Sequence, residues 1–403
     1  MKMDFTQRNI AIDLLRALTM FLMIFVNDLW TIKGEPDWLG HAEWGQDMLG
    51  LADIVFPAFL FAVGMSIPYA IENRFSKGLS GVSTVGHILI RTLALLIMGV
   101  FIVNTESGVS QETGMSLAVY RILMVVGFIL IWNLYPKTEK KSIKQLYSAL
   151  KIAGLILLLY LAIIFRDSNG GIFASRWWGI LGLIGWAYLI CAFVYIFSRD
   201  RLKYLIPIWL LLIIICILKT NMIDETRLLN LPRGNFLDEM LSILHIGNGA
   251  LPAFTMGGIV LSVISTKYLT VNKQKVIFYT VSVVVLLVLG FISHKFWIPS
   301  KLAATPTWIF YCTAISTGVY GLLCWVVEKG KANWFDVIKP AGTATLTCYL
   351  VPYLCYSIWA ILGFHLPKLL TTGILGIIKC ILFSLLVIGI TYLLGKIKIK
   401  LKI

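Results

Sequence analysis

Charged residues are scarce in this sequence. They make up 14% of its 403 residues, against about a quarter in a soluble globular domain. Hydrophobic residues account for 59%, and the mean hydropathy is +0.86. A chain of this length with so few charges does not have the surface of a soluble protein. We therefore expect an all-α polytopic membrane protein.

Signatures of several enzyme classes are also lacking. No Walker loop, dinucleotide fingerprint, zinc-ligand spacing or Gly-x-Ser-x-Gly elbow occurs in a suitable context, which argues against ATP hydrolysis and zinc chemistry. All seven cysteines lie in apolar segments, so no disulfide framework is indicated. The first apolar run carries two charges and has no clear small-residue cleavage site, which indicates a retained helix and not a signal peptide.

What the chain has instead is a series of apolar runs near the length of a membrane span, roughly 17–25 residues. We expect about twelve transmembrane helices, with ten as the lower bound because several runs are short or contain Gly and Pro. The runs cover 10–29, 50–72, 85–103, 115–135, 147–165, 177–197, 204–219, 245–264, 276–293, 308–327, 340–361 and 372–395.

Lys and Arg predict the orientation of these helices. If both termini are cytoplasmic, most basic residues fall in inward-facing segments and most acids outside. This distribution accounts for the net charge of +15 without nucleic-acid binding. The basic loop 137–144 separates a four-helix part, 1–135, from the remaining helices, 147–403. We expect one transmembrane domain, 1–403, with no soluble domain.

Several charges lie inside the predicted spans. Asp13 and Arg16 share a face of the first helix, and Asn27 falls on the same side roughly 21 Å further along. Such charges line a pathway or site, or form a structural ion pair in the bundle. His87 and Arg91 share a face of the third helix. Snorkelling to the interface accounts for Arg91 and for Arg121, but it does not explain Lys379, inside the last span.

The polar, Trp-rich loop after the first span contains the most promising chemistry. His41 lies between Trp38 and Trp44, and Asp53 opens the next span. A neutral imidazole oriented by a carboxylate can remove a proton from an amine or hydroxyl, or take up an acyl group covalently. Asn27 could hold the reacting carbonyl or the imidazole. The alternatives are a hydrogen-bonded structural histidine and an aspartate that caps its helix.

These residues carry a resemblance to the heparan-alpha-glucosaminide N-acetyltransferase family, which is specific over the first seventy residues and weaker beyond them. The matching motifs are Asp13-x-x-Arg16, Phe25-Val26-Asn27, His41-Ala42-x-Trp44, Ala52-Asp53-Ile54-Val55-Phe56-Pro57, Gly64-x-Ser66, Tyr120-Arg121, Leu251-Pro252-Ala253 and Pro299-Ser300-Lys301. The chain departs from the family in having Ala17 where Gly is usual and Ser300 where Asn is usual.

The resemblance implies that an acetyl group passes from cytosolic acetyl-CoA to the amine of a heparan-derived glucosamine across the membrane. It places the catalytic histidine at His41, its partner asparagine at Asn27 and the helix-opening acid at Asp53. For acetyl-CoA we expect contacts from Asp13, Arg16, Arg91, Arg121 and Lys301. For the acceptor sugar, where exposed tryptophans suit stacking, we expect contacts from Asp28, Trp44, His294 and Trp297. No metal is expected.

The expected partners follow from this reading. They are acetyl-CoA, an amino sugar or short glycosaminoglycan fragment, and the lipid bilayer, without nucleic acid; a homodimer is left open. We expect a multi-pass inner-membrane protein whose site reaches the periplasm. Two alternatives stand beside the acetyltransferase. One is an amino-sugar transporter whose pathway is lined by the intramembrane charges, and the other is an O-acetyltransferase of a cell-envelope glycan.

Overall fold

The computed structural model describes residues 5, 7–228, 236–269 and 271–403, and over this part of the chain it is helical, with isolated bridges but no β-strand. The α-helices are α1 Ile10–Asp28, α2 Leu51–Ser76, α3 Gly81–Glu106, α4 Leu117–Trp132, α5 Lys141–Ile164, α6 Ile180–Ser198, α7 Leu202–Lys219, α8 Phe236–Ile243, α9 Ala250–Val263, α10 Asn272–His294, α11 Pro306–Glu328, α12 Phe335–Thr343, α13 Thr345–Ile361 and α14 Gly373–Lys396.

The helix lengths confirm an all-α polytopic membrane protein. Among the described residues, ten helices are long and apolar enough to cross a bilayer, and the bent pair α12–α13 makes eleven. The apolar helix α4 is shorter. Each of the twelve predicted spans overlaps one of these helices, except 340–361, which overlaps both α12 and α13. The largest shift in a boundary is at α5, which begins at Lys141 and so includes part of the predicted basic loop. Gln7 and Arg8, just before α1, and Lys400–Ile403, after α14, line one cavity, so these two segments lie on the same side of the bundle.

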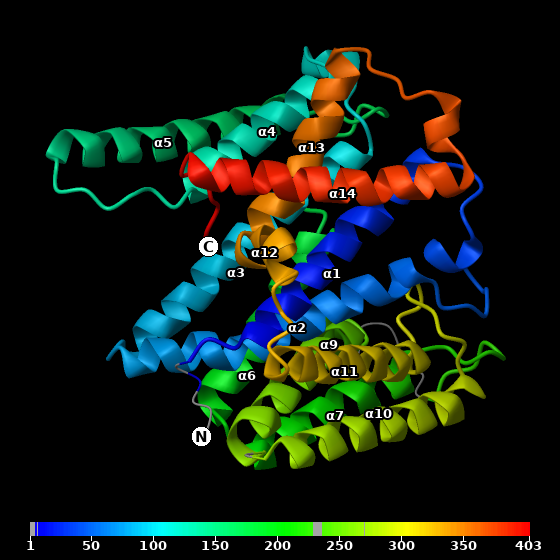
Figure 1. The fold of residues 1–403 in the computed structure, drawn as a ribbon. Helices are drawn as coiled ribbons and strands as arrows, with labels where there is room; N and C mark the ends of the chain where they lie inside the picture. Colours follow the sequence, from blue (N-terminus) through cyan, green and yellow to red (C-terminus); the bar gives the residue numbers. More distant parts are fainter. Residues whose placement is uncertain (1–4, 6, 229–235, 270) are drawn as a thin grey trace.

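The helix α1 lies at the centre of the bundle, in contact with α2, α11, α12, α13 and α14. In Figure 1, α2, α7, α9, α10 and α11 lie below it, and α4, α5, α13 and α14 lie above. The closest packing is between α2 and α9, where a Cβ on Gly64 would lie 1.9 Å from the Thr255 carbonyl oxygen and one on Gly258 would lie 2.1 Å from that of Phe61. Only glycine permits this approach of two backbones.

The segment predicted as one span, 340–361, is two helices. α12 and α13 meet at 92°, with Ala344 between them in a non-helical conformation. Gly342 packs on α1, where a Cβ would lie 2.7 Å from the Asp13 carbonyl oxygen. The break turns Thr343 and Thr345 toward a cavity beside α1. Such irregular backbone is tolerated in membrane proteins where it lines a cavity.

Candidate active site

The loop that precedes α2 brings His41 and Asp53 together. A Cβ on Gly50 would lie 2.0 Å from the Gly40 carbonyl oxygen, so the residues on the two sides of the segment 41–49 are in close contact. His41 Nδ1 is 2.6 Å from Asp53 Oδ1. The Asp53 side chain is 3% exposed and that of His41 is 51% exposed. The histidine is therefore accessible while its carboxylate partner is buried.

Asp53 is held by several donors besides His41. Its Oδ2 accepts a hydrogen bond from the backbone N–H of Ala42 at 2.9 Å and a longer one from that of Gly50 at 3.4 Å. The indole N–H of Trp308 donates to its backbone carbonyl at 2.9 Å. Asp53 thus caps α2 and also holds the His41 ring, and a catalytic role for the pair stays a prediction. Because a carboxylate accepts, His41 carries its proton on Nδ1, which leaves Nε2 as the basic nitrogen.

Lys301 adds a positive charge beside this pair. Its Nζ is 3.4 Å from His41 Nδ1 and 3.5 Å from Nε2, and these nearly equal distances place the ammonium beside the ring. Burial lowers the pKa of Lys301, and the negative charge of Asp53 acts in the opposite direction. Lys301, expected to contact acetyl-CoA, is therefore located at the histidine. It does not line the cavity beside α1, which is called the inner cavity below.

Asp28, at the end of α1, is buried with protein partners. Tyr356 donates a hydrogen bond to its Oδ1 at 2.6 Å, and Lys379 Nζ lies 2.8 Å from its Oδ2. The side chains of Asp28 and Lys379 are 1% and 13% exposed. This pair explains the charge in the last span, which the sequence left open. Its neighbour Asn27 is exposed. A substrate contact for Asp28 stays a prediction.

The other residues expected at the acceptor differ in their exposure. His294 Nε2 is 2.7 Å from Asp47 Oδ1, so a second histidine–carboxylate pair joins α10 to the loop that carries His41. Trp44 is largely exposed, whereas Trp297 is buried and its indole N–H donates to the Thr220 carbonyl at 3.1 Å. Trp44 is thus available for stacking on a sugar, and Trp297 already has a structural role.

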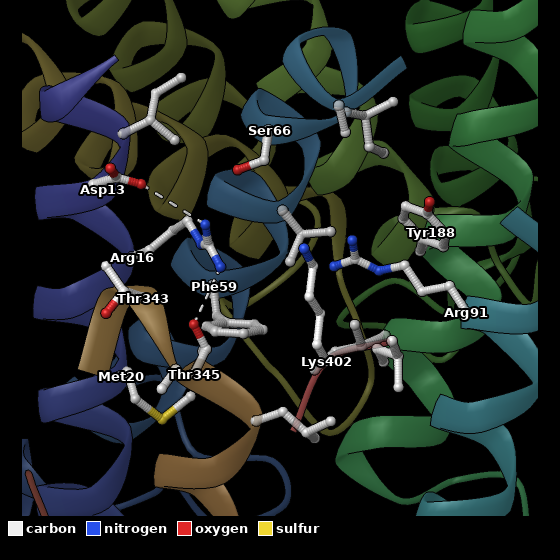
Figure 2. Close-up of a pocket in the computed structure, with 18 of the residues that line it drawn as sticks. Asp13, Arg16, Met20, Phe59, Ser66, Arg91, Tyr188, Thr343, Thr345 and Lys402 are labelled. Atoms are coloured by element: carbon white, nitrogen blue, oxygen red, sulfur yellow. Dashed lines mark hydrogen bonds and ion pairs between the residues drawn. The ribbon is translucent and has the colours of Figure 1, made fainter. Parts of the chain in front are cut away.

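A cavity of about 620 Å³ opens beside α1, lined also by α2, α3, α6, α13 and the segment after α14. Figure 2 shows Arg16 on one side and Arg91 and Lys402 on the other, all pointing into the same space. Asp13 carries the one acidic side chain among the described lining residues. The basic residues that line the cavity are Arg8, Arg16, Arg91, Lys400 and Lys402.

The cations of the cavity have few partners within the protein. The predicted Asp13–Arg16 contact is present at 3.8 Å, but Arg8 is closer to Asp13, at 2.5 Å. Arg16 also donates to Thr345 Oγ1 at 3.1 Å. The Arg91 guanidinium lies 4.7 Å from the Tyr188 ring centroid, and its buried Nε has no hydrogen-bond partner. This arrangement suits an anionic ligand.

The cavity becomes apolar toward the other end of the bundle. Met23, four residues before Asn27, lines it on α1, and Phe59, six residues after Asp53, lines it on α2. At 1.5 Å per residue these positions lie roughly 6 and 9 Å of helix rise from Asn27 and Asp53. The cavity therefore runs from a basic mouth toward the ends of α1 and α2 that carry Asn27 and Asp53, and its described lining stops at Met23 and Phe59. It suits an elongated ligand with an anionic head and a less polar arm.

The sequence-based assignment of the cavity was incomplete. Arg8, Lys400 and Lys402 were not expected there, because their positions near the termini fit the positive-inside pattern equally well. Arg121 does not line the cavity, and its guanidinium donates to the Thr105 carbonyl at 3.2 Å. Its contact with acetyl-CoA stays a prediction. Within the described part of the chain, no cluster of His, Cys, Asp and Glu could hold a metal ion.

Comparison with known proteins gives matches of two kinds. A family model described as "Domain of unknown function (DUF5009)" matches residues 8–229. Over 95 residues the chain is 36% identical to heparan-alpha-glucosaminide N-acetyltransferase of Mus musculus and 35% identical to the protein of that name from Homo sapiens. The matched stretch covers 23% of this chain but only 14% of the mouse and 13% of the human protein. These matches support a distant relationship.

Proposed function

Because the chain belongs to the DUF5009 family, whose description names no activity, we propose its function from the site and from the distant likeness to acetyltransferases. It is a transmembrane acetyltransferase that moves the acetyl group of cytosolic acetyl-CoA to the amine of a glucosamine on the periplasmic side of the inner membrane. The observation that carries the proposal is the cavity leading from a basic mouth toward the His41–Asp53 pair.

The donor enters this cavity from the cytoplasm. Arg16 and Arg91 bind its phosphate oxygens, for which a guanidinium offers paired donors. The pantetheine arm follows the α1 face, past Met20 and Met23, and presents the thioester near Asn27 and His41. In this proposal the whole of 1–403 acts as one acyltransferase domain, since α1 and α2 carry the outer residues and also line the cavity.

The transfer needs a base and a donor for the developing oxyanion. His41 Nε2 removes a proton from the attacking amine, whose nitrogen bonds to the thioester carbon. The C–S bond then breaks, and the leaving thiolate takes the proton back from the imidazolium. Asp53 holds the ring and stabilises its charged form. General-base catalysis of this kind raises the reaction rate by about 10²–10⁴-fold. Lys301 and Asn27 stabilise the oxyanion, where one donor is worth about 10²–10³-fold.

The acceptor binds on the outer side of this pair. The Trp-rich surroundings favour a sugar there, and the exposed indole of Trp44 offers a stacking face. We propose a heparan-derived glucosamine because the relatives bear that name. An O-acetylated glycan would use the same base and the same donor.

The experiment that tests the function is the substitution His41→Ala. The purified variant is expected to bind acetyl-CoA with the wild-type dissociation constant and to transfer no acetyl group to glucosamine, because the cavity lies apart from the base. The matched variant Arg91→Ala should weaken acetyl-CoA binding while retaining the base. Full transfer activity in His41→Ala would remove the core of the proposal.

A further inference from the structure

The segment after α14 is fixed to the rest of the bundle. The backbone N–H of Leu134 donates to the Lys400 carbonyl at 2.8 Å, and that of Lys402 donates to the Trp132 carbonyl at 2.9 Å. Lys400 N–H donates to the Asn133 side chain at 2.8 Å, and Leu401 N–H donates to Thr347 Oγ1 at 2.9 Å. The segment is therefore held by the end of α4 and the start of α13.

The side chains of this segment alternate between the bundle and the cavity mouth. Leu401 is buried, and it lines a small apolar pocket with Val125, Leu350 and Leu394 as well as bordering the inner cavity. On either side of it, Lys400 and Lys402 also belong to the lining of the inner cavity. Anchoring Leu401 thus places two lysines at the mouth.

These lysines join a group of like charges. Figure 2 shows Lys402 beside Arg91, with both side chains directed at the space that Arg16 faces from the other side. The pKa of Lys400 is lowered by burial and, to a smaller extent, by the charges of Lys402, Arg16 and Arg8. Bringing like charges together costs free energy that a polyanion in their midst would offset.

The number of charges indicates what kind of anion fits. Arg16 and Arg91 together match the two negative charges of a diphosphate. Among the side chains that line the cavity, the one acid, Asp13, is paired with Arg8, so the side chains of Lys400 and Lys402 provide a further two positive charges. A phosphate monoester carries about −1.5 to −2 at pH 7, and it would match this second pair.

We propose that Lys400–Ile403 is a clamp over the cavity mouth whose two lysines bind a phosphate monoester on the ligand, in addition to the diphosphate. Resting on the proposed function, this assigns Lys400 and Lys402 to the 3′-phosphate of acetyl-CoA. The clamp makes the cavity select donors that carry this extra phosphate over donors with a diphosphate alone.

The test compares acetyl-CoA with its 3′-dephospho form, by calorimetry on the purified full chain in neutral detergent. The wild type is expected to bind acetyl-CoA about tenfold more tightly. In Lys400→Gln/Lys402→Gln the two dissociation constants should become nearly equal, while the value for the dephospho form changes little. Lys400→Arg/Lys402→Arg should keep the preference.

The matched control is Lys398→Gln, which removes the same charge from an exposed lysine that does not line the cavity, and it should keep the preference. A second variant tests the anchor without changing charge. Thr347→Val removes the acceptor of the Leu401 N–H, so it should reduce the preference even if the double lysine variant fails to fold.

Three results separate the clamp from the proposed function. An unchanged preference in both Lys400→Gln/Lys402→Gln and Thr347→Val would overturn the clamp and leave the acetyltransferase intact. A wild type without preference, the result expected if the lysines serve lipid headgroups, would also overturn it. If the wild type binds neither CoA form, the proposed donor is wrong. The affinity for tripolyphosphate is then measured in its place. The clamp requires that Lys398→Gln bind tripolyphosphate more tightly than Lys400→Gln/Lys402→Gln does, and equal affinities would overturn it.

Discussion

Replacing Lys379 by Met tests the buried ion pair that ties α14 to the end of α1. Methionine keeps an unbranched side chain of similar length but removes the charge 2.8 Å from Asp28 Oδ2. The Asp28 carboxylate, 1% exposed, would keep only neutral hydrogen-bond donors such as Tyr356. Breaking a buried pair on one side costs about 3–5 kcal/mol, so we expect the free energy of unfolding to fall by about that amount.

A second substitution separates the charge from the packing. In Asp28→Asn/Lys379→Met no buried charge is left unpaired, and the amide oxygen of the new side chain can still accept from Tyr356. Since neutral replacements of a buried pair are often tolerated, the double variant should recover most of the loss. The exposed Lys368 provides the control, because Lys368→Met should change stability by no more than about 0.5 kcal/mol.

Equilibrium unfolding of the purified variants in mixed micelles, followed by tryptophan fluorescence, measures these differences. If the free energy of unfolding of Lys379→Met falls by less than about 0.5 kcal/mol, the reasoning is refuted, because a buried charge left unpaired destabilises a protein by more than that. A double variant no more stable than Lys379→Met would refute it as well, since packing and not charge would then be responsible.

Three further predictions address the packing and the site. Gly64→Ala should lower the free energy of unfolding by about 1–3 kcal/mol, because its Cβ would meet the Thr255 backbone, whereas Gly86→Ala, with nothing within 4 Å, should not destabilise the same unfolding transition. Asp53→Asn should lower the transfer rate by about 10²–10⁴-fold at unchanged acetyl-CoA affinity, because an amide N–H facing Nδ1 moves the His41 proton to Nε2; a wild-type rate would count against this. Burial lowers the pKa of Lys301 from its ordinary 10.5, so the transfer rate should fall as pH rises through this lowered value, and Lys301→Arg should move the decline to higher pH; an unmoved pH profile would exclude Lys301 from the reaction.

The same shift fixes the sign of a stability effect. Between the lowered pKa of folded Lys301 and 10.5, the unfolded chain binds more protons than the folded chain. The contribution of Lys301 to the free energy of unfolding should therefore rise with pH over this interval.

The length of each apolar run was sufficient to predict where the helices lie. The break between α12 and α13 was not predicted, because a Pro and a Gly within an apolar run also occur in continuous membrane helices. What turns the chain there is the packing of Gly342 against the Asp13 backbone, a contact between positions far apart in the sequence. No pattern within 340–361 reports it.

In the site, too, contacts between residues near in sequence could be predicted, and contacts between distant residues could not. The contact between His41 and Asp53 could be anticipated because they are only twelve positions apart and the loop after His41 ends at the helix that Asp53 opens. Lys379 and Asp28 are 351 positions apart, so only the folded bundle shows that they pair. Likewise, nothing in the sequence around Lys400 and Lys402 distinguishes them from the lysines of an ordinary basic cytoplasmic tail. Their place in the cavity depends on the anchoring of Leu401 between α4 and α13.

The most direct test of the central claim is acetyl transfer across a membrane. Proteoliposomes with the basic mouth of the cavity facing inward would be loaded with acetyl-CoA and placed in labelled glucosamine. The account predicts N-acetylglucosamine in the outer solution and free CoA inside, with neither product in His41→Ala vesicles. Labelled glucosamine accumulating unmodified inside, independently of acetyl-CoA, would contradict the account and indicate a transporter.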